Sequence, residues 1–236
     1  MSECPNTHFL NLSETNDIEI LYRVYSNLID MLKARNYIID AEDIKGENLS
    51  EFKDNFEDIN DPDISILQFI AEKKDETKKN EDETKDNDEE TEKIAIFWTD
   101  VEKIGVKQIK SYMDFMDENE VNHSIIIMKH SITTFALRTL EDFNANFSDK
   151  FIEYFEYSEL LINITKHVLV PFHTVLNLSE KAELIKKYQL KKEAQLPKLH
   201  RTDPIARYYG LRKGDVVKVT RPSATSTTYI TYRIVV

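Results

Sequence analysis

Cysteine, glycine and long apolar runs are scarce in this chain. Cys4 is the one cysteine among 236 residues, which excludes an intramolecular disulfide and a multi-cysteine zinc site. Four glycines, Gly46, Gly105, Gly210 and Gly214, are too few and too scattered for a GxGxxG or GxxxxGK phosphate-binding loop. No apolar run approaches the roughly 20 residues that span a bilayer. The N-terminus has neither a secretory nor a transit-peptide pattern. We therefore expect a protein of the cytosol or nucleus with no membrane partner.

Charge is distributed unevenly along the chain. The net charge is −12, yet residues 158–236 hold 14 Lys and Arg against 6 Asp and Glu, a net of +8. The preceding residues hold 17 against 37, a net of −20. Because non-specific affinity for DNA comes mainly from neutralising phosphates, the acidic part is not expected to bind duplex DNA by itself. Any contact with DNA has to be local and held in place by a partner.

The N-terminal part alternates helix-like and strand-like segments. Residues 16–34 carry apolar side chains at three- and four-residue spacing, and Asn16 with Glu19 resembles a capping box. Further helices are expected at residues 49–56, 106–116 and 133–144, and strands at 37–39, 64–70, 94–98, 124–128 and 151–155. Strands that alternate with helices of this length indicate an α/β domain.

Residues 72–93 interrupt this pattern. They include no large apolar side chain, so burial cannot offset the entropy of ordering them. We predict a disordered charged insertion inside one domain, because strand-like runs lie on both sides of it.

The C-terminal part predicts a small mixed α/β domain. Ser179 is expected to cap a helix that ends near Tyr188, while Asp203 and Pro204 open a second helix that Gly210 stops. Residues 216–220 and 229–235 are expected to form the strands of a hairpin whose turn lacks glycine. The expected division is a flexible tail at residues 1–15, a domain at 16–157 and a domain at 158–236.

One catalytic pattern is present. Pro62 and Asp63, followed by residues 72–74 (EKK), match the loose PD…(D/E)xK pattern of Mg²⁺-dependent nucleases. The (D/E)xK half also occurs at residues 43–45, 51–53, 76–78 and 83–85, so chance in a Glu- and Lys-rich chain is the favoured explanation. The six histidines form no HxxxH or HExxH motif, and His167 and His173 fall in an expected loop around Pro171, which favours surface or structural roles.

Arginine and tyrosine are interleaved near the C-terminus. Six basic residues alternate with four aromatic ones: Arg207, Arg212, Lys213, Lys218, Arg221 and Arg233 with Tyr208, Tyr209, Tyr229 and Tyr232. Such a surface suits nucleic acid, through charge and base stacking, and suits a protein interface equally well. The spacing leaves both interpretations open, including a free-standing nucleic-acid-binding module.

A series of C-terminal segments resembles one known family. In order, they are residues 159–165 (ELLINIT), 169–171 (LVP) with His173, 195–197 (QLP), 203–210 (DPIARYYG), 213–218 (KGDVVK), 221–223 (RPS) and 229–233 (YITYR). They resemble the subunit shared by eukaryotic nuclear RNA polymerases I, II and III, whose C-terminal part alone corresponds to a small subunit of the archaeal RNA polymerase. Upstream similarity is weaker but collinear, at residues 51–56, at Ile64, at 104–110 and in the apolar strand before Lys129.

The resemblance implies a non-catalytic subunit located in the nucleus, in both nucleoplasm and nucleolus, with no cofactor, metal or small-molecule substrate. It implies an N-terminal jaw domain, similar in fold to restriction endonucleases, that lies beside downstream duplex DNA. The C-terminal domain would bind the largest polymerase subunit, near other small common subunits. Its signature residues in this chain are Asp203, Pro204, Arg207, Tyr208, Gly210, Lys218, Arg221, Tyr229, Tyr232 and Arg233.

The chain departs from the family pattern at three places. The family's DNA-facing loop reads GMTPSA, and here residues 131–136 read SITTFA, which keeps Thr133 and assigns DNA proximity to Lys129 and Thr133. Thr227 stands where the family usually has a turn glycine, so we expect a turn type without a positive φ angle there. Phe172 stands where the family often has Glu.

Overall fold

The computed structural model divides into two compact units, Met1–Ile162 and Asn163–Val236, called here the N-terminal and the C-terminal unit. It describes residues 17–41, 43–46, 48–56, 58, 62–73, 92–147, 150–223 and 227–236. The predictions for residues 1–15, for Asn16 and for most of the charged insertion lie outside the described residues. Both units mix helices with sheets, which confirms the predicted α/β fold class.

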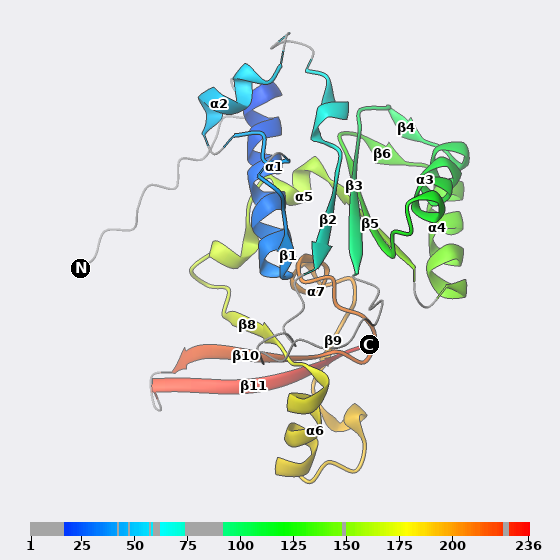
Figure 1. The fold of residues 1–236 in the computed structure, drawn as a ribbon. Helices are drawn as coiled ribbons and strands as arrows, with labels where there is room; N and C mark the ends of the chain where they lie inside the picture. The colour runs from blue at the N-terminus through cyan, green and yellow to red at the C-terminus, as the bar shows by residue number, and fades with distance from the viewer. Residues whose placement is uncertain are drawn as a thin grey trace, which may run out of the picture. The chain divides into compact units, whose positions relative to one another are not determined.

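The N-terminal unit is built on a five-stranded sheet in the order β1-β2-β3-β5-β7 (Figure 1). Its strands are β1 (Tyr37–Ile38), β2 (Phe69–Lys73), β3 (Lys93–Thr99), β5 (His123–Met128) and β7 (Phe151–Glu156). β2 runs antiparallel to β1 and β3, whereas β3, β5 and β7 are mutually parallel. Helices α1 (Asp17–Ala34), α2 (Leu49–Asp54), α3 (Val106–Glu118), α4 (Thr134–Asn146) and the short α5 (Tyr157–Leu160) complete the unit, with the two-residue pair β4 (Lys103–Ile104) and β6 (Ser131–Ile132).

Each face of this sheet is covered by helices. The α1 stripe predicted from the sequence is buried, and the Tyr25 ring lies 6.4 Å from the Trp98 ring of β3. On the opposite face, Ile109 of α3 and Leu140 of α4 pack into one apolar cluster with Ile126 of β5. The apolar side chains of β3 and β5 therefore pack into two separate cores, one on each face of the sheet, as expected for a sheet with crossover helices.

Two sequence predictions in the N-terminal unit are wrong in detail. Residues 64–70 are not one strand: Ile64–Leu67 form a 3-10 helix, and β2 begins only at Phe69. The carboxylate of Asp63 accepts hydrogen bonds from the Ser65 N–H at 3.0 Å and the Ser65 hydroxyl at 2.6 Å, which favours a turn over extended backbone. The ends of the charged insertion are also ordered, because Glu72 in β2 pairs in register with Lys93 in β3.

The C-terminal unit contains a four-stranded sheet in the order β8-β10-β11-β9. Its elements are β8 (Phe172–Val175), α6 (Leu178–Lys187), β9 (Lys198–Leu199), α7 (Pro204–Tyr208), β10 (Val216–Ser223) and β11 (Thr227–Val235), with 3-10 helices at Ile164–Lys166 and Glu193–Gln195. Val216 and Ile234 pack with Leu184 of α6, whereas Val217 and Val235 pack with Ala206 of α7. Neighbouring residues of one strand thus serve two small cores, one on each face of the sheet.

Three local predictions in this unit need correction. The cap of α6 is Asn177, not Ser179: its side chain accepts a hydrogen bond from the Glu180 N–H at 2.9 Å, and the helix begins at Leu178. His173, expected in a loop, lies in β8. Thr227 does adopt a positive φ of 55°, a left-handed conformation that is strained for a β-branched residue. The ladder between β10 and β11 continues to Ser223 opposite Thr227 and imposes this geometry.

Candidate functional site

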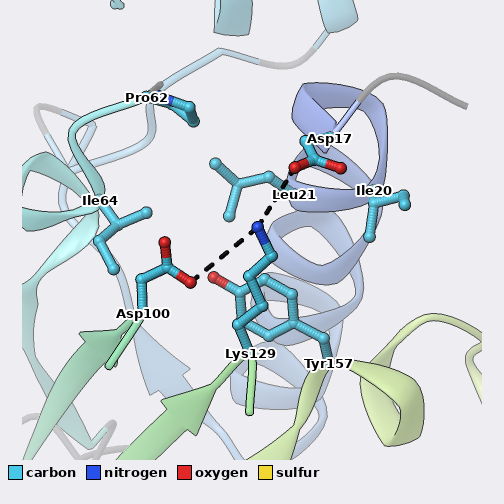
Figure 2. A pocket seen from close by; sticks show the side chains of 8 residues that line it. All are labelled: Asp17, Ile20, Leu21, Pro62, Ile64, Asp100, Lys129 and Tyr157. Atoms are coloured by element: carbon cyan, nitrogen blue, oxygen red, sulfur yellow. Dashed lines mark hydrogen bonds and ion pairs between the residues drawn. The ribbon is translucent and has the colours of Figure 1, made fainter. Parts of the chain in front are cut away.

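A pocket lies at the carboxyl ends of the three parallel strands of the N-terminal unit. Asp100 follows β3, Lys129 follows β5 and Tyr157 follows β7. Because these adjacent strands are parallel, the three polar side chains lie at one edge of the sheet. This is the edge at which α/β sheets usually bind ligands. The remaining lining residues are Asp17, Ile20 and Leu21 of α1 with Pro62 and Ile64, around a volume of about 250 Å³ (Figure 2).

Lys129 is already held by carboxylates within this pocket. Its Nζ lies 3.2 Å from Oδ2 of Asp17 and 4.0 Å from Oδ1 of Asp100, as Figure 2 shows. His130 Nε2 lies 3.7 Å from the same oxygen of Asp100. Burial raises the pKa of Tyr157, and the nearby charge of Asp100 raises it further, so the phenol keeps its proton at neutral pH. A phosphate that reaches Lys129 has to compete with Asp17 for the ammonium group.

Thr133, the other residue assigned to DNA, caps a helix. Its hydroxyl accepts a hydrogen bond from the Ala136 N–H at 3.3 Å and donates one to the Ile104 carbonyl at 3.0 Å. Its own N–H donates to that same carbonyl at 3.1 Å. The side chain therefore fixes α4 against β4, whereas Lys129 belongs to the pocket. DNA proximity of these two residues stays a prediction.

The nuclease-like pattern does not form a site among the described residues. Glu72 and Lys73 are exposed on β2, where Glu72 pairs with Lys93 at 3.8 Å and Lys73 pairs with Glu92 at 2.5 Å. Lys74 lies outside the described residues. The hydrogen bonds from Ser65 lower the pKa of the exposed Asp63 carboxyl. Within the described ranges, no three His, Cys, Asp or Glu side chains are grouped to hold a metal ion, and no described helix is long and apolar enough to cross a bilayer.

Four of the C-terminal signature residues build the unit itself. Asp203 caps α7 by accepting from the Ile205 N–H at 2.9 Å, and Pro204 occupies the first helical position. Gly210, with φ of 61°, ends the helix in a Schellman arrangement, in which the next N–H, that of Leu211, donates to the Ala206 carbonyl at 2.9 Å.

Tyr208 is the fourth of these residues. Its ring is buried, and its hydroxyl accepts a hydrogen bond from Asn163 Nδ2 at 3.3 Å. Its hydroxyl is thus used inside the unit, where it ties α7 to the start of the unit's chain.

The other signature residues lie on the sheet or beside it. Tyr232 packs against the α6 core, with its ring 5.9 Å from that of Tyr188. Arg221 and Tyr229 are exposed opposite one another, and the guanidinium of Arg221 lies 5.4 Å from the ring centre of Tyr229. The three remaining signature residues are half-buried: Arg207, Lys218 and Arg233. The structure thus shows that Tyr208 is buried inside the unit and that Arg221 is exposed, a difference that the sequence did not predict.

A buried polar cluster in the N-terminal unit was not predicted from the sequence. Glu153, in the middle of β7, lies 3.2 Å from His123 Nε2, and His123 Nδ1 lies 3.3 Å from the Tyr37 hydroxyl. Arg35, at the end of α1, completes the cluster. The signal that was overlooked is a glutamate inside the apolar run FIEYF, since a charged residue in a covered strand requires a partner.

Comparison with known proteins places both units in one family. The model for the RNA polymerase Rpb5 N-terminal domain matches residues 15–116, and the model for the RNA polymerase Rpb5 C-terminal domain matches residues 162–235. The second match begins one residue before the boundary between the units.

Curated relatives match over almost the whole chain. A Dictyostelium discoideum protein named as DNA-directed RNA polymerases I, II, and III subunit rpabc1 is 38% identical over 93% of this chain and 99% of its own. The equivalently named Caenorhabditis elegans protein is 36% identical over 92% of this chain and 95% of its own. An Arabidopsis thaliana protein named as subunit 5B of polymerases IV and V is 32% identical over 91% of this chain and 88% of its own.

Proposed function

The chain belongs to the Rpb5 family of RNA polymerase subunits, and from this premise we propose that it is a non-catalytic subunit shared by nuclear RNA polymerases I, II and III. Its relatives carry that name in an amoeba and in nematodes, and a plant relative is named for polymerases IV and V. The location that follows is the nucleus, in both nucleoplasm and nucleolus.

The C-terminal unit is the part that anchors the subunit to the largest polymerase subunit, near other small common subunits. The supporting observation is a group of exposed apolar side chains around β8 and the start of α6. Val168, Leu169, Phe172 and Leu178 are 93%, 84%, 71% and 86% exposed. Several large apolar side chains that are exposed close together in the sequence are typical of a surface that a partner covers. The excess of Lys and Arg in this unit favours an acidic partner surface and orients the two proteins.

The N-terminal unit has the jaw role, beside downstream duplex DNA. Its acidic composition opposes non-specific adhesion to nucleic acid. At the carboxyl edge of its sheet, the ammonium group of Lys129 is paired with Asp17, and His130 lies beside Asp100. Such pairing makes DNA contact weak unless the assembled enzyme holds the duplex in place.

Purification of the tagged full-length chain from its own cells tests this function. We expect the largest and second-largest subunits of polymerases I, II and III in amounts comparable to the tagged chain. Recovery of the chain without any large polymerase subunit at moderate salt would overturn the proposal. Recovery of polymerases IV or V instead would assign the chain to those enzymes and leave its role as a polymerase subunit unchanged.

Two phenylalanines with the same exposure provide the matched comparison. Phe172, 71% exposed in the C-terminal unit, is changed to Asp, and Phe135, 72% exposed on α4, is changed to Asp as the control. We expect Phe172→Asp to reduce the recovered largest subunit on the order of tenfold, because a charge in a desolvated interface costs several kcal/mol. Phe135→Asp is expected to leave the recovered amount unchanged.

A second pair of variants compares the two units. Arg207→Ala is expected to weaken incorporation into the polymerase more than Lys129→Ala does. A larger loss with Lys129→Ala would show that the N-terminal unit, and not the C-terminal unit, anchors the subunit.

A further inference from the structure

Strand β11 is much longer than the strand on its outer side. It pairs with β10 along its length, from Thr227 opposite Ser223 to Ile234 opposite Val216. On its other side, β9 covers only Ile234 and Val235. The outer side of residues 229–233, called here the β11 edge, faces no strand among the described residues (Figure 1).

The hydrogen bonds at the end of β11 show which backbone groups point outward. The Ile234 N–H donates to the Pro197 carbonyl beside β9 at 2.9 Å, whereas the Val235 N–H donates to the Asp215 carbonyl on the β10 side at 2.9 Å. In a strand, the N–H and C=O of one residue point to the same side and alternate from residue to residue. Ile230 and Tyr232 therefore direct both of their backbone groups toward the β11 edge.

The β11 edge has few of the features that prevent strand addition. Its residues, YITYR, are rich in side chains that favour β-structure, with no proline and one charge. The opposite edge of the sheet differs, because β8 is only four residues long and follows Pro171. The open length of five residues matches the usual length of a strand, roughly five to six residues.

Side chains on the two faces beside the β11 edge differ in chemistry. Tyr229 and Arg233 lie on one face with Arg221, so an acidic side chain of an added strand is attracted there. Ile230 and Tyr232 lie on the other face, where Ile230 is 44% exposed. An apolar or aromatic side chain of the added strand is favoured on that face.

We propose that the β11 edge binds an extended segment of another polymerase subunit as a fifth strand, and that this segment alternates acidic with apolar or aromatic side chains. The identity of the partner rests on the proposed function. The mode of binding rests on the backbone groups of Ile230 and Tyr232 and on the two unlike faces. Main-chain hydrogen bonds supply affinity in such complexes, and alternate side chains supply selectivity.

Amide hydrogen exchange tests the proposal directly. In the isolated full-length chain, the amides of Ile230 and Tyr232 are expected to exchange rapidly, while those of Thr231 and Arg233, which face β10, exchange slowly. In the purified polymerase that contains this chain, both outward amides are expected to gain protection of roughly a hundredfold or more. Unchanged exchange at both amides in the assembled enzyme would overturn the proposed strand addition and leave the subunit role intact. If no polymerase is recovered with the chain, the subunit role and the proposed strand partner fall together.

A pair of variants gives an independent readout. Ile230→Pro removes an outward N–H without removing a hydrogen bond of the sheet, whereas Ile230→Val keeps it. We expect Ile230→Pro to lower recovery of the largest subunit on the order of tenfold and Ile230→Val to leave it unchanged. Equal recovery with both variants would contradict the proposal. Thermal unfolding of each variant shows whether the sheet is intact, and the exchange measurement on the unaltered chain decides the matter if Ile230→Pro does not fold.

Discussion

Nη1 of Arg35 lies 2.6 Å from Oε2 of Glu153, although 118 residues separate them in the sequence. The side chains are only 4% and 11% exposed. Burial by itself raises the pKa of Glu153, but the charge of Arg35 and the hydrogen bond from His123 outweigh burial and hold the pKa at about 2, below the ordinary 4.5. The Glu153 carboxylate in β7 therefore stays ionised inside the N-terminal unit, and its ion pair with Arg35, the residue after α1, links that helix to β7.

We expect the stability of the chain to fall as the pH drops from about 4.5 to about 2. As the pH falls through this window, the Glu153 carboxyl takes up a proton in the unfolded chain before it does so in the folded one. The contribution of its ionised form to the free energy of unfolding is therefore complete above pH 4.5 and is lost toward pH 2. The difference between the pKa values of the unfolded and folded states corresponds to about 3 kcal/mol. Urea unfolding at pH 7, 4.5 and 3 should show a smaller loss for Glu153→Gln than for the unaltered chain. Glu141→Gln, at an exposed position on α4, serves as the control, and parallel losses in all three proteins would contradict the expected role of Glu153.

Removal of Arg35 alone should be costly. Arg35→Met leaves the Glu153 carboxylate buried without its main partner, for which the expected loss of stability is about 3–5 kcal/mol. The double variant Arg35→Met with Glu153→Met should recover most of that loss, because two apolar side chains then replace the pair. A double-mutant cycle in urea measures the coupling. Additive losses would show that the two side chains do not interact.

Thr133 should behave as a helix cap in the isolated chain. Thr133→Ala is expected to lower stability by about 1 kcal/mol, because the Ala136 N–H loses its acceptor. Thr133→Ser keeps the hydroxyl and should lose little. Chemical denaturation of both variants without DNA provides the measurement, and equal stability of the two would assign the hydroxyl to a role outside the fold.

The turn between β10 and β11 should be improved by a glycine. Thr227 has a φ of 55°, and relief of the left-handed conformation gains about 1–2 kcal/mol, against about 0.5–1 kcal/mol of extra backbone entropy lost by glycine. Thr227→Gly is therefore expected to raise the melting temperature slightly. Thr220→Gly, in the middle of β10, should lower it instead, and a loss for both variants would contradict the strain at Thr227.

The alternative of a free-standing nucleic-acid-binding module predicts tight binding by the isolated chain with a steep salt dependence. We expect weak binding of single-stranded RNA and duplex DNA at about 150 mM salt, because the acidic N-terminal part repels phosphate and Tyr208 and Tyr232 are used inside the C-terminal unit. Fluorescence anisotropy across salt concentrations measures this. Submicromolar binding that is lost on Arg221→Ala would favour the alternative.

Elements with strong local signals were predictable from the sequence alone. The helix α1, the apolar strands β3 and β5 and the start of α7 at Asp203 and Pro204 depend on periodicity, side-chain caps and proline, which act within a few residues. The 3-10 turn after Asp63 and the cap at Asn177 were missed because several neighbouring polar residues compete for the same backbone N–H groups.

The order of the C-terminal segments identified the family, since that order is a property of the chain as it is written. Only the tertiary structure decided which polar side chains serve the fold and which face outward. Tyr208 is buried and accepts a hydrogen bond from Asn163, 45 residues away, whereas Tyr229 of the same signature is exposed beside Arg221. The pairing of Arg35 with Glu153 and the open edge of β11 have the same origin, because burial and strand partners depend on residues that the fold brings together from distant parts of the chain.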